Sequence, residues 1–362
     1  ISCPPGLHAV ATSAPWARNQ PSSARVSAGG QIGSRSPAVM SMSSSRPGPT
    51  FDTLGTVGDS EMFTFGDDVK TFPTEGRLDF TSVSVTRAET RLTMFTVLEA
   101  WFDKDTVVVP RDFIYPEDQS NDDSDQQGAA QLANSQDASR VAALRAMGLK
   151  VPEEIIVDSV VEDGPADGVL KEGDVILAVD GKAISTVQNT ADAIADRKPG
   201  DEVRLTIERA GKKRDLAVST TVHPEDAKRA RVGITVGMSF DFPISIENHI
   251  GDRVGGPSAG LMFALGMYDQ LTPGPLTGGM NVAGTGSIAP TGEVGPVGGI
   301  AQKLAGAEDA DADVFLVPAS NCAEYLHARD FDMTVVKVET LDDAIRSIEA
   351  LNEDPKAKVP TC

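Results

Sequence analysis

Cysteine and histidine are scarce in this chain, and their spacing predicts no metal site. The 362 residues contain three cysteines and four histidines. Cys3, Cys322 and Cys362 are odd in number and widely separated, so they indicate neither a metal-ligand pattern nor a disulfide framework. The histidines have no zinc-binding spacing either. We therefore expect no metal and no cofactor.

Basic residues are also in short supply, which argues against nucleic-acid partners. Lysine and arginine number 32 against 53 acidic residues, for a net charge of −21. Residues 1–50 hold four arginines and no acid, so the remainder carries −25. A chain of this charge repels phosphate backbones and anionic membranes. Residues 1–50 are rich in Ser, Pro, Ala and Gly, and we expect them to be disordered or non-native.

Two further absences concern membranes and ATP. The chain has no apolar run of about 18 residues that would span a bilayer. It also has no G-x-x-x-x-G-K-[S/T] phosphate loop, so ATP-driven work is not expected. The basic stretch 211–214 lacks that glycine spacing, and we interpret it as a hairpin turn.

What the chain does contain is a serine in a glycine-rich setting. Ser258 follows Gly255, Gly256 and Pro257 and precedes an apolar stretch, 259–271, that suits a buried helix. Backbone N–H groups converge at a helix start and can stabilise an oxyanion. The alternative is that Pro257 and Ser258 only begin a helix.

A lysine 45 residues later is the candidate base. Lys303 lies among Val297, Ile300, Leu304 and Ala305, while the nearest acidic residues, Glu293 and Glu308, are ten and five positions away. A lysine accepts a serine proton only when its amine is neutral, so its pKa must fall to about 7 to 8. Burial can supply the roughly 4 kcal/mol that this shift costs. Most lysines on helices are nevertheless solvated.

The stretch 281–303, NVAGTGSIAPTGEVGPVGGIAQK, resembles the proteolytic domain of Lon proteases, and the likeness extends over about 230–350. The resemblance implies that Ser258 is the nucleophile of the family's GPSAG motif and Lys303 its general base. It also implies that Thr285 orients the lysine and that N–H groups around Gly256 and Pro257 form the oxyanion hole. The usual Lys-Asp before GPSAG is absent here, which leaves specificity open.

Residues 148–223 resemble a PDZ domain of the bacterial protease type. Strands are expected at 155–161, 175–179, 203–208 and 216–220, with a helix at 190–197 and a hairpin turn at Asp180–Gly181. PDZ domains bind peptide C-termini at a sheet edge. The carboxylate-binding loop is placed at Met147, Gly148 and Leu149, with a helix C-cap at Gly148 as the alternative.

These patterns predict an α+β chain in which the PDZ domain, a β-barrel-like unit, is inserted into a Lon proteolytic domain of the ribosomal protein S5 domain 2-like fold. A strand over 77–85 and a helix over 92–102 begin the protease domain. The acidic run 117–134 is predicted to be an exposed loop. The boundaries are 1–50 for the N-terminal segment, 51–147 and 224–352 for the protease domain, 148–223 for the PDZ domain and 353–362 for the tail.

The resemblance is to PDZ-containing Lon-like proteases of Gram-positive bacteria, which carry a membrane helix just before an element seen here as Pro47–Thr50. It implies the extracytoplasmic face of the membrane, although no membrane segment is found. Either the anchor is lost or the first 46 residues are not the natural start; an organelle transit peptide is the alternative.

The predicted function is an ATP-independent serine endopeptidase that acts on unfolded or C-terminally exposed proteins, with a hexameric ring implied by resemblance. An inactive PDZ adaptor is the main alternative, and a Ser/Lys C-terminal-processing protease is a third. His249, nine residues before Ser258, is another candidate base. No Gly-Asn-Ser-Gly-Gly segment of trypsin-like proteases accompanies it, which favours a structural role.

Overall fold

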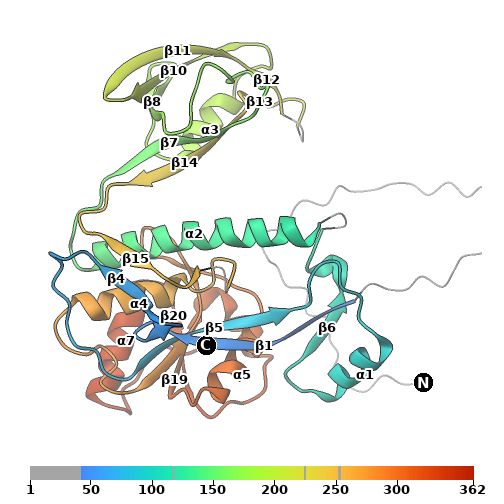
Figure 1. The fold of residues 1–362 in the computed structure, drawn as a ribbon, viewed down its shortest axis with the longest axis vertical. Coiled ribbons are helices and arrows are strands. Elements are labelled where there is room, and N and C mark those ends of the chain that lie inside the picture. The colour runs from blue at the N-terminus through green and yellow to red at the C-terminus, as the bar shows by residue number, and fades with distance from the viewer. Residues whose placement is uncertain (1–41, 117–118, 224–225, 252–253) are drawn as a thin grey trace, which may run out of the picture. The chain divides into compact units, whose positions relative to one another are not determined.

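The computed structural model describes residues 42–116, 119–223, 226–251 and 254–362 and divides them into two compact units (Figure 1). The large unit comprises residues up to Thr64, Thr71–Ala142 and Asn248–Cys362. The small unit comprises Phe65–Lys70 and Ala143–Glu247. In sequence, the small unit therefore lies between two parts of the large one.

A six-stranded mixed sheet forms the centre of the large unit. Its order is β20 (Thr334–Val338), β19 (Val314–Pro318), β16 (Asn281–Gly284), β5 (Arg77–Val85), β1 (Met42–Asp52) and β6 (Val107–Pro110). The first four strands are parallel to one another, whereas β1 is antiparallel to both of its neighbours. The parallel strands need crossover helices, and the helices α4 to α7 of this unit follow the strands in sequence as such connections require.

Helices surround this sheet, and the most buried of them leads away from Ser258. Helix α4 (Gly260–Leu271) is apolar on all sides, with Leu261, Met262 and Phe263 fully buried. A helix that is hydrophobic all round belongs in a core. The others are α1 (Met94–Phe102), α2 (Asn121–Ala146), α5 (Ile300–Asp309), α6 (Cys322–Tyr325), α7 (Leu341–Glu353) and the 3-10 turns η2 (Arg111–Phe113) and η4 (Ala319–Asn321).

Short strands complete the connections. They are β2 (Thr56–Val57), β3 (Ser60–Glu61), β4 (Phe63–Phe65), β15 (Ile246–Asn248), β17 (Ser287–Ile288) and β18 (Val294–Gly295). The β17–β18 hairpin lies between β16 and α5 in sequence, within the stretch that carries the Lon resemblance.

The small unit is a β-sheet with its own apolar core. Its order is β11 (Lys212–Ser219), β10 (Glu202–Arg209), β8 (Val175–Val179), β7 (Glu153–Val160) and β14 (Ile234–Phe240), with β9 (Lys182–Ala183) beside β8. Helix α3 (Val187–Ala195) and the pair β12 (Thr221–Val222) and β13 (Ala230–Arg231) complete it. Buried Val, Ile and Leu side chains from all five main strands or their flanks form the core.

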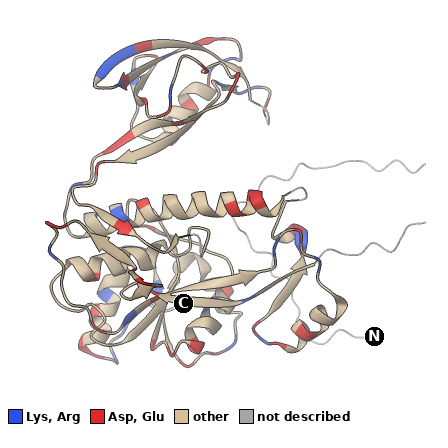
Figure 2. Ribbon diagram, in the orientation of Figure 1, with Lys and Arg blue, Asp and Glu red and all other residues tan. Residues whose placement is uncertain are grey.

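Two predicted turns of this unit are confirmed. Asp180 and Gly181 have φ of 50° and 75° and connect β8 to β9, as a type I′ turn requires. The second turn consists of Ala210 and Gly211, with φ of 52° and 70°, so only the first residue of the basic stretch 211–214 lies in it. Lys212, Lys213 and Arg214 begin β11 and carry the positive charge marked on that hairpin in Figure 2.

The acidic run 117–134 was predicted wrongly as an exposed loop. From Asn121 onward it is the first half of α2, a helix of 26 residues. Ser120 and Asp123 cap its start reciprocally, because the serine hydroxyl accepts from the Asp123 N–H and the carboxylate accepts from the Ser120 N–H. This capping box is a sequence signal that identifies the helix.

The N-terminal prediction also needs correction. Residues 42–50 belong to strand β1 and are paired with β5 and β6, so the segment 1–50 is not disordered throughout. Residues 1–41 lie outside the described residues. Among the described helices, none combines the length and apolar character needed to cross a membrane.

Candidate active site

Ser258 is held at the entrance to α4 by the end of β16. Its backbone carbonyl accepts two hydrogen bonds, from the Thr285 hydroxyl at 3.0 Å and from the Gly286 N–H at 2.9 Å. Leu261 N–H donates in turn to the Gly286 carbonyl at 3.0 Å. These contacts fix the backbone of Ser258 and leave its half-buried side chain to face the neighbouring helix α5.

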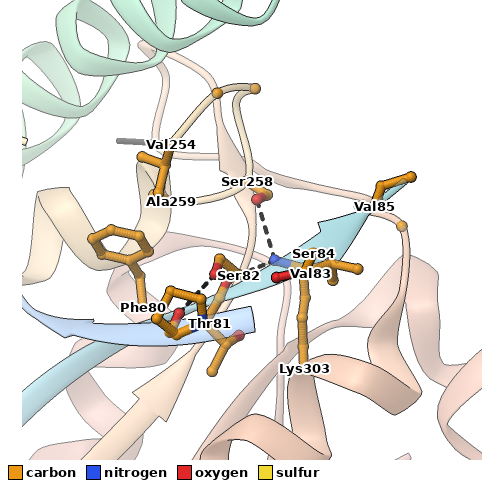
Figure 3. A pocket seen from close by; sticks show the side chains of 14 residues that line it. Phe80, Thr81, Ser82, Val83, Ser84, Val85, Val254, Ser258, Ala259 and Lys303 are labelled. Atoms are coloured by element: carbon orange, nitrogen blue, oxygen red, sulfur yellow. Dashed lines mark hydrogen bonds between the residues drawn. The ribbon is translucent and has the colours of Figure 1, made fainter. Parts of the chain in front are cut away.

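Lys303 reaches the serine from the first turn of α5. Its Nζ lies 3.2 Å from Ser258 Oγ and donates to the Thr81 carbonyl of β5 at 2.6 Å (Figure 3). The helix starts at Gly299, which has φ of 73°. A Cβ there would lie 2.9 Å from Val83, so only glycine lets the start of α5 approach β5 this closely.

Burial sets the protonation state of this lysine. The Lys303 side chain is enclosed, and the residue is only 3% exposed. Desolvation lowers the pKa of Lys303 from 10.5 to about 7, and the nearby Glu324 carboxylate opposes that shift. A neutral amine that donates to the Thr81 carbonyl keeps its lone pair for the proton of Ser258. Burial of Lys303 was expected from its apolar sequence neighbours, whereas the Thr81 contact was not.

Thr285 was predicted to orient Lys303, but the hydrogen bond of its side chain is to Ser258. The Thr285 hydroxyl donates to the Ser258 carbonyl, and the Thr81 carbonyl is the backbone group that accepts from Lys303. Thr285 therefore positions the serine backbone. No sequence pattern singles out Thr81, since its contact with Lys303 is made by the main chain.

The predicted oxyanion donors are only partly available. Gly256 N–H donates to the Gly128 carbonyl of α2 at 2.9 Å, and Pro257 has no N–H. In the segment 256–258, Ser258 is thus the residue whose N–H can still face an oxyanion. The prediction that Gly256 supplies a ready donor is incorrect for this conformation.

A cavity of about 460 Å³ opens beside the serine and lysine. It is lined by β5 from Phe80 to Val85, by Pro49, by the loop at 254–256 with Ser258 and Ala259, and by Gly298 and Lys303. Figure 3 shows Ser258 and Lys303 pointing toward each other beside β5.

A polar cluster missed by the sequence analysis fixes the start of α5. The Asn321 side chain accepts from Val297 N–H at 3.0 Å and donates to the Val297 carbonyl at 2.8 Å. Glu324 accepts from Ile300 N–H at 3.0 Å and from Asn321 at 3.2 Å. Burial raises the pKa of Glu324. Asn321 follows strand β19 closely in sequence, but no sequence pattern assigned it a partner.

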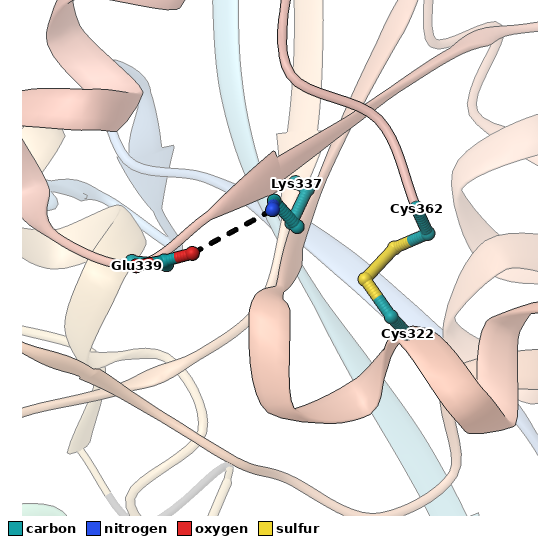
Figure 4. The surroundings of a disulfide bond; sticks show 4 residues. All are labelled: Cys322, Lys337, Glu339 and Cys362. Carbon is teal, nitrogen blue, oxygen red and sulfur yellow. Dashed lines mark ion pairs between the residues drawn. A yellow bond between two sulfur atoms is a disulfide. The ribbon is translucent and has the colours of Figure 1, made fainter.

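The cysteine prediction needs correction too. Cys322 and Cys362 form a disulfide with Cα atoms 5.3 Å apart (Figure 4). Cys322 lies between Asn321 and Glu324 in sequence, so the disulfide ties the C-terminal segment to the cluster that holds α5. The 40-residue separation conceals this pairing from sequence spacing. Cys3 lies outside the described residues.

The remaining candidate residues take structural positions. His249 faces Thr64, with Nε2 2.9 Å from its hydroxyl. Met147, Gly148 and Leu149 donate their N–H groups to the carbonyls of Ala143, Arg145 and Leu144 of α2. Gly148, with φ of 79°, therefore caps α2. In this conformation these three N–H groups are not free to bind a carboxylate.

Two family models match the chain. The Lon protease (S16) C-terminal proteolytic domain matches residues 249–350, and the PDZ domain matches residues 125–220. Neither is an ATPase domain. The first range contains both Ser258 and Lys303, and the second contains most of the small unit.

The DegP-like curated relatives match over the PDZ part. A probable periplasmic serine endoprotease DegP-like of Ectopseudomonas mendocina is 37% identical over 25% of this chain and 19% of its own length. The pro-apoptotic serine protease NMA111 of Candida glabrata is 35% identical over 19% of this chain and 7% of its own length. The chain thus spans less than a fifth of these relatives.

Solved PDZ domains of SdrC-like proteins show the same local similarity. That of Listeria monocytogenes is 31% identical, covering 23% of this chain and 86% of the domain, with a TM-score of 0.22. That of Listeria innocua is 30% identical, covering 22% of this chain and 90% of the domain, with a TM-score of 0.21.

Proposed function

Because the chain carries both a Lon-type (S16) C-terminal proteolytic domain and a PDZ domain, we propose that it is an ATP-independent serine endopeptidase. Ser258 is the nucleophile and Lys303 the general base. The observation that carries this proposal is the 3.2 Å approach of Ser258 Oγ to the enclosed amine of Lys303. A pKa of about 7 keeps that amine partly neutral at physiological pH.

The reaction follows from this pair. Lys303 takes the proton of Ser258 as its Oγ attacks the substrate carbonyl, and a C–O bond forms. The oxyanion is stabilised by backbone N–H groups near Ser258. Lys303 then protonates the leaving amine as the C–N bond breaks, which leaves an ester on Ser258. Water, deprotonated by Lys303, hydrolyses the ester and restores both groups.

The free edge of β5 supports a peptide substrate. β16 pairs with β5 only as far as Phe80, whereas β1 continues to pair with β5 through Thr81, Val83, Ser84 and Val85. Thr86 N–H points to β1, where it meets the Ser44 carbonyl. Strand alternation therefore directs the main-chain groups of Val83 and Val85 to the cavity. An extended substrate can add to this edge and present its peptide bond to Ser258.

The PDZ domain recruits or gates protein substrates in this proposal, and the ring-shaped hexamer implied by the Lon resemblance isolates the site. An extracytoplasmic location accords with the Cys322–Cys362 disulfide, since such bonds persist in oxidising compartments.

One observation favours the alternative of an inactive PDZ adaptor. Gly256 N–H is paired with α2, so a predicted oxyanion donor is occupied. In that reading the protease domain is retained as a scaffold and the PDZ domain carries the function.

Cleavage of fluorescein-labelled casein without ATP distinguishes the two functions. We expect the full chain to cleave casein, and Ser258→Ala and Lys303→Ala to abolish cleavage. Lys337→Ala, which removes a half-buried lysine paired with Glu339, is the matched control and should retain activity. Absence of cleavage by every form, with C-terminal peptides still bound, would support the adaptor.

A further inference from the structure

Helix α2 is in direct contact with the nucleophile loop, defined here as residues 254–258. Gly128 of α2 accepts the Gly256 N–H through its carbonyl at 2.9 Å. Two turns further along the same face of the helix, Ser135 donates its hydroxyl to the Pro257 carbonyl at 3.1 Å. Ser135 is only 4% exposed, so this tie is enclosed. Figure 3 shows α2, pale green, passing above the loop.

The close approach depends on the absence of side chains on both sides. A Cβ added to Gly255 would lie 3.3 Å from Gly128 Cα, and one added to Gly128 would lie 3.5 Å from Gly255 Cα. The two backbones are therefore nearly in contact. A methyl group fits at Gly128, whereas a branched side chain there would extend into the nucleophile loop.

The pairing removes a donor from the reaction. Gly256 has φ of 87°, a conformation that favours glycine and that the pairing with Gly128 holds in place. An N–H bonded to a helix carbonyl cannot stabilise an oxyanion at the same time. Loss of one oxyanion donor lowers kcat by about 10²–10³. The hydrogen bond that withholds it is neutral and makes only a modest net contribution, so it can be released.

We propose that α2 is an autoinhibitory latch: the Gly128 carbonyl withholds the Gly256 N–H from the active site, and Ser135 holds the nucleophile loop against the helix. This inference rests on the proposed endopeptidase function. The latch would keep cleavage slow even though Ser258 and Lys303 are already in contact. The helix ends inside the small unit, because the division between the two units falls between Ala142 and Ala143. The same helix therefore connects the small unit covalently to the latch, so that peptide binding by the PDZ domain can affect it.

The test is to separate α2 from the loop without touching the Ser258–Lys303 pair. Gly128→Leu inserts a branched side chain at the contact and should raise casein turnover at least tenfold. Ser135→Ala removes the hydrogen bond to the Pro257 carbonyl without adding bulk, unlike Gly128→Leu, and should raise turnover severalfold. Ala130→Leu is the matched control, because Ala130 lies on the exposed side of α2 and should leave turnover unchanged.

Amide hydrogen exchange supplies a readout that does not need activity. Measured in the Ser258→Ala background, the peptide covering 254–257 should exchange faster with Gly128→Leu than without it. Unchanged exchange, or faster exchange with turnover equal to or below that of the wild type, would overturn the latch. Faster exchange with no cleavage by any form would instead contradict the endopeptidase on which the latch depends.

Discussion

At the scale of single residues, the account depends on the ionisation of Lys303. Enclosure in an apolar site lowers its pKa to about 7, and the Thr81 carbonyl holds the amine so that its lone pair faces Ser258. A lysine left in solvent titrates near 10.4 and would be a poor base at neutral pH. The environment of this side chain, more than its identity, creates the base.

The pH dependence of cleavage follows from that pKa. Only the neutral amine accepts the serine proton, so kcat/KM should rise with pH and level off above about 7. Casein turnover measured from pH 5 to 9 tests this expectation. A profile still rising tenfold per pH unit at pH 9 would place the lysine in its ordinary range and contradict the assignment.

Glu324 should tune that profile. Its carboxylate raises the pKa of Lys303 against the larger effect of burial. Glu324→Gln keeps an acceptor for Ile300 N–H, with which Glu324 makes a 3.0 Å contact. We expect the rising limb to move to lower pH by less than about one unit, with kcat above pH 8 retained. Movement to higher pH would show that the carboxylate acts on another group.

The enclosed lysine should also cost stability. Its pKa is lower in the folded than in the unfolded chain, so stability falls as pH drops from about 10 to about 7 and is constant below. Lys303→Met should therefore be inactive but more stable at pH 7, by about 1–3 kcal/mol after the unpaired Thr81 carbonyl is allowed for. Urea unfolding at pH 7 and pH 9.5 should show this gain shrinking at the higher pH. Equal destabilisation at both pH values would mean that the lysine is not held neutral.

At the scale of elements, sequence patterns predicted those with a strong local signal. β5 was expected over 77–85 and spans Arg77–Val85, and the helix after Ser258 was expected over 259–271 and is α4, Gly260–Leu271. Apolar periodicity and flanking glycines mark both. The serine and lysine themselves were found through family resemblance, because 45 intervening residues hide their contact from any local pattern.

The elements that were missed have their partners far away in sequence. The first half of α2 has few apolar residues, so its composition favoured a loop. Its capping box and its contacts with the loop at 254–258 stabilise a helix instead. The Cys322–Cys362 pair, the Asn321 cluster and the Thr81 carbonyl depend likewise on tertiary contacts. Sequence spacing alone does not specify such contacts.

The disulfide gives an element-scale prediction. It connects α6 to the segment after α7 across 40 residues, and such cross-links contribute about 2–4 kcal/mol. Cys322→Ser or Cys362→Ser should lower the stability of the large unit by about that amount. Dithiothreitol should lower the melting temperature of the wild type and leave either variant unaffected. Insensitivity of the wild type to the reductant would indicate that the bond does not form.

At the scale of the whole molecule, the candidate active site and the PDZ domain lie in two different units, each with its own core. The large unit holds the serine, the lysine and the cavity, and the small unit supplies a PDZ domain. The sequence predicted both domains because each carries its own motif. The latch on the nucleophile loop was not predicted, since it depends on α2, whose first half was predicted to be a loop.

The most direct test of the central claim is covalent labelling of the full chain with an acylating β-lactone, followed by intact mass measurement and peptide mapping. The account predicts one adduct per chain, on Ser258, formed faster as pH rises through about 7 and absent from Lys303→Met. An adduct on another residue, or labelling of Ser258 that is equally fast without Lys303, would contradict a nucleophile activated by this lysine.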